Sequence, residues 1–380
     1  MLLITNYSRS IIHDVEGYDN HEKVFYCYDK ESGLQSFIAI HNTKRGPALG
    51  GCRYWSYKRF DSEGLTDVLR LSRGMTFKSA LAGLSLGGGK AVISKRHGVS
   101  QQIWEKQLRA FGRFVQTLEG EFVTGEDVGI SVADMKIAAQ ETDYIVGIKP
   151  KETDDGTMRD GDPSPVTAYG VMVGIRSAVK HHFKLKTLSG IVVGIQGCGS
   201  VGSKLAEMLH SEGAKLYVTD IDVTLRERVA HEFGATPCDP DEIYSMPMDV
   251  FAPCALGAVI NEDTFKILSA NIIAGSANNQ LKDHSFGQKL REKNILYAPD
   301  YVINSGGLID VSYDHFNNFD RDDLFRRLGQ IGTTLEEIFK RSDTEDRSTN
   351  DVAQSIAEER LVVPEKTKKT KKTKTSKKKK

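Results

Sequence analysis

The segment IVVGIQGCGSVGSKLAEMLHSEGAKLYVTD, residues 191–220, decides the fold of this chain of 380 residues. It begins with an apolar, strand-like run, continues with an amphipathic helical pattern, and ends with a second strand-like run that closes at Asp220. The turn between the first strand and the helix contains Gly197-x-Gly199-x-x-Gly202. These features in this order predict a βαβ unit of a parallel sheet.

The glycine turn and the acid that follows it indicate a dinucleotide site. Glycines allow a tight turn, close approach of the backbone to a pyrophosphate and tight packing of helix on strand, and the helix N-terminus offers unpaired N–H groups to the phosphates. The Asp220 carboxylate can accept hydrogen bonds from ribose hydroxyls and would repel a 2′-phosphate, which favours NAD over NADP. We therefore predict NAD as the cofactor, bound by Gly197, Cys198, Gly199, Ser200, Val201, Gly202 and Asp220.

The rest of the C-terminal half continues this pattern. A polar segment at residues 149–162 marks a domain boundary, and strand-like runs alternate with helical ones beyond it, which predicts a parallel sheet covered on both faces. Apolar residues spaced by three and four from Leu324 to Ile338 predict a long helix. The strand-like runs are at residues 191–196, 215–220, 248–253, 272–277 and 295–303.

The composition is that of a globular protein with more than one domain. The chain is too long for one ordinary core, and no apolar run is long enough to cross a bilayer. The N-terminus lacks the pattern of a secretory signal, so we expect a cytoplasmic protein. The five cysteines lie far apart and form no C-x-x-C motif, so we expect neither a zinc site nor a disulfide framework.

The net charge of zero hides an uneven distribution of charge. Residues 366–380 hold ten of the 51 basic residues and no acidic one, which leaves 41 basic against 51 acidic residues elsewhere. A segment that repels itself and lacks apolar side chains cannot build a core, so we expect a disordered tail at residues 361–380. Such a tail is either simply solvated or in contact with nucleic acid or another anionic surface.

Two charged residues of the N-terminal half lie where functional side chains are often presented. Lys78 shares one stripe of a predicted helix with apolar residues between Val68 and Ala82, where a lysine must either extend to solvent or meet an anion. Asp127 lies in a predicted loop between a short strand and a helix that Ser131 caps.

The run GLSLGGGKAV, residues 83–92, places three glycines directly before Lys90. It does not match the phosphate-binding pattern G-x-x-x-x-G-K-[ST], because Leu84 stands where the first glycine is required and Ala91 replaces the hydroxyl residue. We therefore expect these glycines to expose backbone in a substrate cleft, with Lys90 serving the substrate.

Seven longer motifs occur in order between about Val24 and Leu361: GPALGGCRYW, GMTFKSALAGLSLGGGKAVI, TGEDVG, GDPSPVTAYG, FAPCALGAVIN, AGSANNQL and YAPDYVINSGG. Together they resemble the amino acid dehydrogenases of the glutamate, leucine, phenylalanine and valine group, and they are most similar to its leucine-specific members. The resemblance implies reversible oxidative deamination of an L-amino acid to a 2-oxoacid, ammonia and NADH. It also implies homo-oligomers, which are octamers among the leucine-specific members.

The same resemblance implies an α/β fold of two domains separated by a cleft. Residues 1–148 would form a substrate, catalytic and oligomerisation domain, to which C-terminal helices at about residues 335–360 return. Residues 149–334 would form a Rossmann-like NAD-binding domain.

The resemblance further implies roles for three charged residues. Lys78 would bind the substrate carboxylate, Lys90 would act in acid/base chemistry at the reacting carbon and activate the attacking water, and Asp127 would exchange protons with the amino group. These roles agree with the chemistry, because the amine must be neutral before oxidation and water must then attack the imine, and no metal ion is needed. The resemblance also places Gly50 and Asn279 near the substrate and Thr167 near the cofactor.

Several positions bear on which amino acid is bound. Glutamate-specific members carry a lysine where Leu49 stands, and a side-chain carboxylate that faced leucine would be desolvated without a partner, so we expect an apolar substrate. Leucine-specific members usually carry alanine at Gly125 and valine at Leu308, so the first change would open room and the second would fill it. Val311 maps to the same pocket, and Asp310, where asparagine is common, would add a charge near it.

We therefore predict an NAD-dependent dehydrogenase of apolar L-amino acids, with leucine favoured and valine and isoleucine also bound. Two alternatives stay open. Gly125 is typical of phenylalanine-specific members, which leaves a dehydrogenase of aromatic amino acids such as phenylalanine or tryptophan. The acidic body with its lysine-rich tail would also suit a non-catalytic, nucleotide-sensing binding protein, although such a protein would not need Lys78, Lys90 and Asp127 together.

Overall fold

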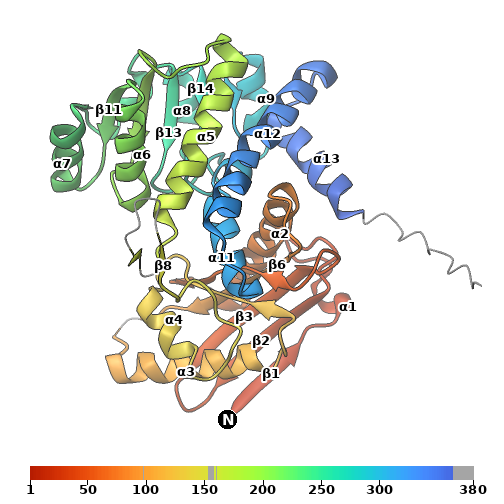
Figure 1. Cartoon of the computed structure of the whole chain (residues 1–380). Helices are drawn as coiled ribbons and strands as arrows, with labels where there is room; N and C mark the ends of the chain where they lie inside the picture. Colours follow the sequence, from red (N-terminus) through yellow and green to blue (C-terminus); the bar gives the residue numbers. More distant parts are fainter. Residues whose placement is uncertain (97, 153–157, 160, 363–380) are drawn as a thin grey trace, which may run out of the picture.

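The computed structural model describes residues 1–96, 98–152, 158–159 and 161–362, which form two α/β units (Figure 1). The N-terminal unit is built on a sheet of seven strands, and the C-terminal unit is built on a parallel sheet of six strands. In Figure 1 the first sheet is red and orange and the second is green and cyan. The predicted α/β fold with two domains is confirmed. Residues 363–380, nearly all of the predicted tail, lie outside the described residues.

The N-terminal sheet mixes antiparallel and parallel pairs. Its strands are β1 (Leu2–Asn6), β2 (Lys23–Asp29), β3 (Leu34–Asn42), β4 (Ala48–Leu49), β5 (Cys52–Trp55), β6 (Gly87–Ser94) and β7 (Phe122–Val123). The order is β1-β2-β3-β6-β4-β7, with β5 also beside β6. The first four strands in this order pair antiparallel, whereas β4, β5 and β7 run parallel to their partners.

Helices cover both faces of this sheet. They are α1 (Arg9–Ile12), α2 (Leu65–Leu81), which follows a π-helical turn (Phe60–Gly64), α3 (Gln101–Gln116) and α4 (Val132–Ala138). Side chains alternate along β3, so Phe37 packs in the core with α2 while Ile38 packs in the core with α3. Ser100 caps α3, and Ser131 with Asp134 forms the predicted capping box of α4.

The three glycines before Lys90 have a different purpose from the one that we expected. They lie within β6 and are buried, so they do not expose backbone in a cleft. A Cβ on Gly88 would lie 2.0 Å from the backbone nitrogen of Thr76 in α2, and one on Gly89 would lie 2.7 Å from the Phe122 ring. Gly88 therefore allows α2 to pack closely on β6, and these two elements carry Lys78 and Lys90, whereas Gly89 leaves room for Phe122.

The C-terminal sheet has the strand order of a doubly wound dinucleotide-binding fold. Its strands are β10 (Val192–Gln196), β11 (Lys215–Thr219), β12 (Thr236–Pro237), β13 (Val250–Pro253), β14 (Ile272–Ile273) and β15 (Leu296–Tyr297). All pairs are parallel, in the order β12-β11-β10-β13-β14-β15, so the chain reverses direction across the sheet after the third strand. Each of the five predicted strand-like runs contains one of these strands.

One of those runs ends in a helix. Residues 295–303 were expected to be extended, but the chain turns at Pro299 and continues as the short helix α10 (Asp300–Ile303). A short apolar run has no periodicity that separates a strand from a buried helical turn. The turn matters for function, because it places Asp300 and Tyr301 at the cleft.

The helices of the C-terminal half complete the second unit, and some of them also contact the first. They are α5 (Ser164–Phe183), α6 (Ser200–Ser211), α7 (Val223–Phe233), α8 (Glu262–Ile267), α9 (Ser285–Glu292), α11 (Gly306–Phe316), α12 (Arg321–Glu345) and α13 (Thr349–Leu361), with a 3-10 turn (Ile243–Ser245) and a small hairpin of β8 (Lys151–Glu152) and β9 (Met158–Arg159). The predicted apolar stripe of α12 is buried. Arg360 of α13 donates to the carbonyl of Leu81 at 2.8 Å, so the last described helix returns to α2. Among the described helices, none has the length and apolar character of a membrane span.

Candidate active site

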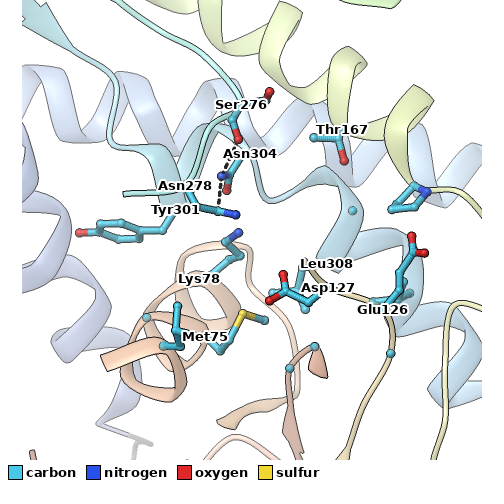
Figure 2. Close-up of a pocket in the computed structure, with 18 of the residues that line it drawn as sticks. Met75, Lys78, Glu126, Asp127, Thr167, Ser276, Asn278, Tyr301, Asn304 and Leu308 are labelled. Carbon is cyan, nitrogen blue, oxygen red and sulfur yellow. Dashed lines mark hydrogen bonds between the residues drawn. The ribbon is translucent and has the colours of Figure 1, made fainter. Parts of the chain in front are cut away.

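A pocket of about 430 Å³ lies where the two units meet, and it brings most of the predicted site residues together (Figure 2). Its walls come from α2, β4, β6, the loop after β7, the start of α5, the loop at residues 276–279, α10 and α11. The predicted residues that line it are Leu49, Gly50, Lys78, Lys90, Gly125, Asp127, Thr167, Val201, Asn279, Leu308 and Val311. Val201, which lies within the glycine turn, is part of this lining, whereas the three glycines of the turn and Asp220 are not.

Lys90 and Asp127 form an ion pair in this pocket. The Nζ atom of Lys90 lies 2.9 Å from Oδ2 of Asp127, and the Nε atom of Arg53 lies 3.4 Å from the same oxygen. Only 5% of Lys90 is exposed. Burial alone would raise the pKa of Asp127, but the positive charges of Lys90 and Arg53 outweigh it and lower that pKa. Asp127 is therefore a carboxylate that stays ionised in the pocket, in direct contact with the side chain of Lys90.

Lys78 extends from α2 into the same pocket, as Figure 2 shows. Leu71 and Met75 of its helical stripe also line the pocket, so the stripe faces the cleft and Lys78 is placed to meet an anion there. Burial lowers the pKa of Lys78 to about 8, helped by the charge of Lys90 and opposed by Asp300 and Asp127. At neutral pH Lys78 is thus mainly a cation, and the neighbouring charges determine the pH at which it loses its proton.

Asp300 is a pocket residue that sequence reasoning missed. Its side chain is held by the backbone, because Oδ1 accepts from the N–H of Tyr301 at 2.7 Å and Oδ2 from the N–H of Gln280 at 3.2 Å. Burial raises the pKa of Asp300, while these hydrogen bonds and the charge of Lys78 oppose that rise. The residue occurs in a quoted motif, YAPDYVINSGG, but the expectation of a strand there gave no reason to place it at the cleft.

Two more polar residues support this side of the pocket. Asn304 donates to the carbonyl of Ser276 at 3.0 Å and to Oδ1 of Asn278 at 2.7 Å, which holds the loop that also carries Asn279 (Figure 2). Asn279 has a left-handed backbone with a φ of 52°, a conformation that asparagine tolerates better than most residues. The amides at residues 278 and 279 therefore face the cleft from a fixed loop.

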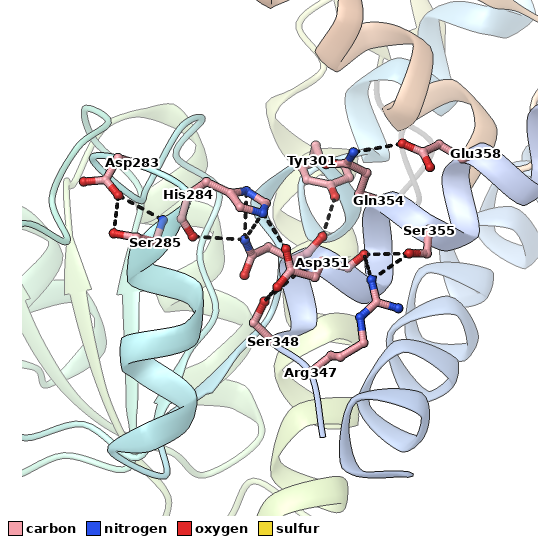
Figure 3. A network of polar contacts seen from close by, with 11 residues as sticks. Asp283, His284, Ser285, Tyr301, Arg347, Ser348, Asp351, Gln354, Ser355 and Glu358 are labelled. Atoms are coloured by element: carbon pink, nitrogen blue, oxygen red, sulfur yellow. Dashed lines mark hydrogen bonds and ion pairs between the residues drawn. The ribbon is translucent and has the colours of Figure 1, made fainter. Parts of the chain in front are cut away.

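The pocket wall continues into a polar network at the start of α13 (Figure 3). The hydroxyl of Tyr301 donates to the carbonyl of Asn350 at 3.5 Å, and His284 pairs with Asp351 at 2.5 Å. Because α13 also contacts α2 through Arg360, one helix touches both sides of the cleft.

The glycine turn has the geometry that a pyrophosphate requires. Gly197 has a φ of 105°, and a Cβ on Gly202 would lie 1.8 Å from the carbonyl oxygen of Gly197. A Cβ on Gly199 would have no neighbour within 4 Å, so this position is open to a ligand. Ser200 starts α6, whose N-terminal N–H groups lie next to that open position. The turn therefore fits a dinucleotide.

Asp220 stands at the end of β11, next to the turn. Its Oδ2 atom accepts from the N–H of Cys198 at 2.6 Å, and its Oδ1 atom accepts from the N–H of Asp222 at 2.8 Å. A carboxylate has further lone pairs, so these bonds position the group without using up its capacity to accept from ribose hydroxyls. Cys198 is buried, with its thiol directed to the carbonyl of Thr219.

Comparisons with known proteins agree with this geometry. Residues 21–147 match the dimerisation domain of Glu/Leu/Phe/Val dehydrogenases, and residues 221–362 match the Glutamate/Leucine/Phenylalanine/Valine dehydrogenase domain. The chain is 48% identical over 347 residues to a leucine dehydrogenase of Geobacillus stearothermophilus, which covers 91% of this chain and 92% of the relative. The chain belongs to the Glu/Leu/Phe/Val dehydrogenase family.

Other relatives in the comparisons carry names of aromatic specificity. An L-tryptophan dehydrogenase of Nostoc punctiforme is 44% identical over 342 residues, covering 90% of this chain and 93% of the relative. The crystal structure of L-tryptophan dehydrogenase from Nostoc punctiforme has a TM-score of 0.78 at 41% identity, covering 93% of this chain and 98% of that one. This chain is therefore an amino acid dehydrogenase, an oxidoreductase that uses a nicotinamide cofactor. The alternative of a non-catalytic sensor is not supported.

The dehydrogenase pocket differs from the sequence-based expectations at two positions. Gly125 was expected to open room for the substrate, but a Cβ there would point at the carbonyl oxygen of Val146, 2.8 Å away. Its effect on the pocket therefore passes through the backbone of the neighbouring segment. Asp310 was expected to add a charge near the pocket, but it is fully buried outside the pocket lining, and its charge is paired with Lys151 and Arg159. Leu49 and Leu308 are buried apolar residues of the lining, as expected.

Proposed function

We propose that this dehydrogenase catalyses the reversible, NAD-dependent oxidative deamination of apolar L-amino acids in branched-chain amino acid catabolism, with leucine preferred and valine and isoleucine also accepted. The observation that carries the proposal is one pocket in which two lysines and an aspartate meet an apolar wall that includes Leu49 and Leu308. A cation in place of Leu49 would be needed to pair with a glutamate side chain. The similarity to leucine dehydrogenases supports the same choice.

The three charged residues have complementary tasks in this proposal. Lys78 binds the α-carboxylate of the substrate as a cation at the side of the pocket that α2 forms. Asp127 accepts a proton from the substrate ammonium group, which leaves the neutral amine that oxidation requires. Lys90, 2.9 Å from Asp127, stabilises charge that develops at the reacting carbon and activates the water that attacks there. The bound cofactor supplies the hydride acceptor.

NAD is the proposed form of the nicotinamide cofactor. Gly197, Gly199 and Gly202, with the N-terminus of α6, suit the pyrophosphate, and Asp220 suits ribose hydroxyls while repelling a 2′-phosphate. Thr167, at the start of α5, lines the pocket and is proposed to lie near the cofactor.

We further propose separate roles for the two domains, self-association and a cytoplasmic location. Residues 1–148, with the helices that return at about 335–360, bind the substrate and form the contacts of a homo-oligomer, and residues 149–334 bind NAD. Residues 21–147 match a domain that is described as a dimerisation domain, which supports self-association. The five cysteines are free, which suits the reducing environment of a cytoplasm.

The proposal is tested with purified full-length protein, NAD and a panel of L-amino acids at mildly alkaline pH, by absorbance at 340 nm. We expect turnover of L-leucine, L-valine and L-isoleucine with a higher kcat/KM than L-phenylalanine, L-tryptophan or L-glutamate. A higher kcat/KM for the aromatic substrates would replace the proposal with an aromatic amino acid dehydrogenase. Absence of turnover with every member of the panel would refute it.

A further inference from the structure

Four buried charged residues form a cluster behind one wall of the pocket. Arg159 of β9 lies 2.5 Å from Oδ1 of Asp310, and Lys151 of β8 lies 3.3 Å from Oδ2 of the same residue. Lys151 also lies 2.9 Å from Oδ1 of Asp314. The exposed fractions of these four side chains lie between 0% and 7%. The hairpin of β8 and β9 is thus joined to α11 by ion pairs that water does not reach.

Such a cluster needs a reason other than stability. Taking charges out of water costs free energy that their mutual attraction often fails to recover, so a buried ion pair is weak evidence for stability, and in some proteins its role is to fix a specific geometry. Two cations and two carboxylates balance one another here, and each pair has a defined partner atom. The arrangement joins α11 to the hairpin through directed contacts between defined atoms.

The cluster also holds the backbone that lines the pocket. Oδ2 of Asp314 accepts from the N–H of Gly147 at 2.8 Å, and Arg159 donates to the carbonyl of Asp162 at 2.7 Å. Gly147 lines the pocket, and so do Gly161 and Pro163 on either side of Asp162. Segments before and after the hairpin are therefore tied to the same helix.

The tied segments meet the side chains of α11 that face the substrate. Leu308 and Val311 line the pocket, and Asp310 lies between them in the chain with its side chain directed away. A Cβ on Gly147 would contact Val311 at 3.4 Å, and one on Gly161 would lie 2.5 Å from the carbonyl of Gly147. The wall is therefore closely packed, and a small movement of α11 against Gly147 and Gly161 would change its width.

We propose that the buried ion pairs of Asp310 and Asp314 with Lys151 and Arg159 set the width of the pocket wall formed by Gly147, Leu308 and Val311. Asp310 is then a specificity-determining position that acts through α11 and does not touch the substrate. The inference rests on the proposed function, because it assigns the wall to the side-chain end of an apolar amino acid.

The test compares Asp310→Asn with the wild-type protein on L-valine, L-leucine and L-phenylalanine. Asparagine keeps the shape of the side chain and removes its charge, which takes the carboxylate partner of Arg159 out of the cluster and leaves Lys151 paired with Asp314. We expect the ratio of kcat/KM for L-phenylalanine to that for L-valine to rise by about threefold to tenfold, which is smaller than the roughly 10- to 200-fold effect of a whole methylene in a pocket because the wall moves without losing a group. A purely structural role would lower all three values equally, and that result would overturn the proposal.

A second variant separates selectivity from stability. Arg159→Gln combined with Asp310→Asn leaves Lys151 paired with Asp314 and no cation unpaired within the cluster. We expect the urea midpoint of this double variant to be closer to that of the wild type than the midpoint of Asp310→Asn. The ratio of kcat/KM for L-phenylalanine to that for L-valine should stay raised, because α11 is no longer tied to β9. A ratio that returned to the wild-type value would contradict the proposal. Asp241→Asn, at an exposed position, is the matched control and should change neither quantity.

A binding measurement distinguishes failure of this inference from failure of the proposed function. The rise in melting temperature with 3-methyl-2-oxobutanoate, 4-methyl-2-oxopentanoate and phenylpyruvate, in the presence of NADH, reports the width of the pocket without turnover. Asp310→Asn should shift the order of these rises toward phenylpyruvate. An unchanged order would overturn the inference even if the wild type oxidises leucine, whereas wild-type protein without turnover would overturn only the proposed function.

Discussion

The ammonium nitrogen of Lys90 lies 2.9 Å from Oδ2 of Asp127, although Lys90 is on β6 and Asp127 is in the loop after β7. The contact depends on the strand order β6-β4-β7, which brings two segments that are distant in sequence to one end of the sheet. Arg53 approaches the same oxygen at 3.4 Å, so the carboxylate stays charged while it is largely buried. A base and an acid of the proposed reaction are thus already in hydrogen-bond reach of each other.

Replacing Lys90 by methionine should remove turnover and leave cofactor binding intact. Methionine keeps most of the buried volume but can neither stabilise developing charge nor exchange a proton, so we expect kcat to fall by about 10²- to 10⁴-fold. NADH binding, followed by its fluorescence, should change little because the glycine turn is in the other unit. Lys106→Met, on the exposed face of α3, is the control. Turnover near that of the wild type in Lys90→Met would remove Lys90 from the mechanism.

The charge of Lys78 should make binding of carboxylates depend on pH. Its pKa is about 8 in the protein without substrate, so the cation is present below that pH and is lost above it. For an apolar acid without amino or oxo group, 4-methylpentanoate, we expect affinity to fall about tenfold between pH 7 and pH 9, as a single ionisation requires. Competitive inhibition at fixed NAD measures it. Lys78→Met should bind this acid weakly at every pH.

The pH dependence of carboxylate binding should shift when the charged groups around Lys78 are changed. Asp300 and Asp127 favour the cationic form of Lys78, and Lys90 opposes it. Asp300→Asn should therefore lower the pKa of Lys78, so that carboxylate binding weakens at a lower pH than in the wild type. If the binding profile of this variant overlaid that of the wild type, Asp300 would serve only to hold the loop through its contacts with Gln280 and Tyr301.

Local sequence patterns were sufficient to predict those elements whose structure is determined by residues close to them in the chain. The glycine turn, its helix and the acid at Asp220 follow one another within 30 residues, so each constrains the next. The helical stripe with Lys78 and the loop with Asp127 were also predictable, since periodicity and the cap at Ser131 mark their elements. What these patterns could not decide was whether Lys78 meets solvent or the cleft, because that depends on the packing of α2 between the two units.

Contacts between distant segments account for what was missed or wrong. Asp300 reaches the pocket because a short helix follows β15, and the apolar run around it has no period that separates the two structures. Asp310 was predicted to place a charge near the pocket, because the sequence does not show that Lys151 of β8 and Arg159 of β9 are its partners. The glycines before Lys90 are required by the approach of other segments, α2 at Gly88 and Phe122 at Gly89, which the run itself does not reveal.

Gly125→Ala should narrow the pocket indirectly. A Cβ at this position would lie 2.8 Å from the carbonyl oxygen of Val146, closer than such contacts normally allow, so one of the two backbone segments must move. Both residues line the pocket. We expect a loss of about 1–3 kcal/mol in the free energy of unfolding, as is usual for overpacking, with a larger fall in kcat/KM for L-phenylalanine than for L-valine. Urea denaturation and the substrate panel measure the two effects, and an unchanged ratio of substrates would show that Gly125 has no part in specificity.

Asp220→Asn should weaken the preference for NAD. The substitution keeps one acceptor for the N–H groups of Cys198 and Asp222 but removes the negative charge that favours ribose hydroxyls and repels a 2′-phosphate. Hydrogen bonds to charged groups contribute about 1.5–3 kcal/mol, so we expect KM for NAD to rise by roughly tenfold or more while KM for NADP falls. Asp222→Asn, two residues further along at the N-cap of α7, serves as the matched control. Steady-state kinetics with both cofactors give the ratio of kcat/KM. If that ratio did not change in Asp220→Asn, the carboxylate would act only by holding the glycine turn against β11, and the choice of cofactor would have to arise elsewhere in the cleft.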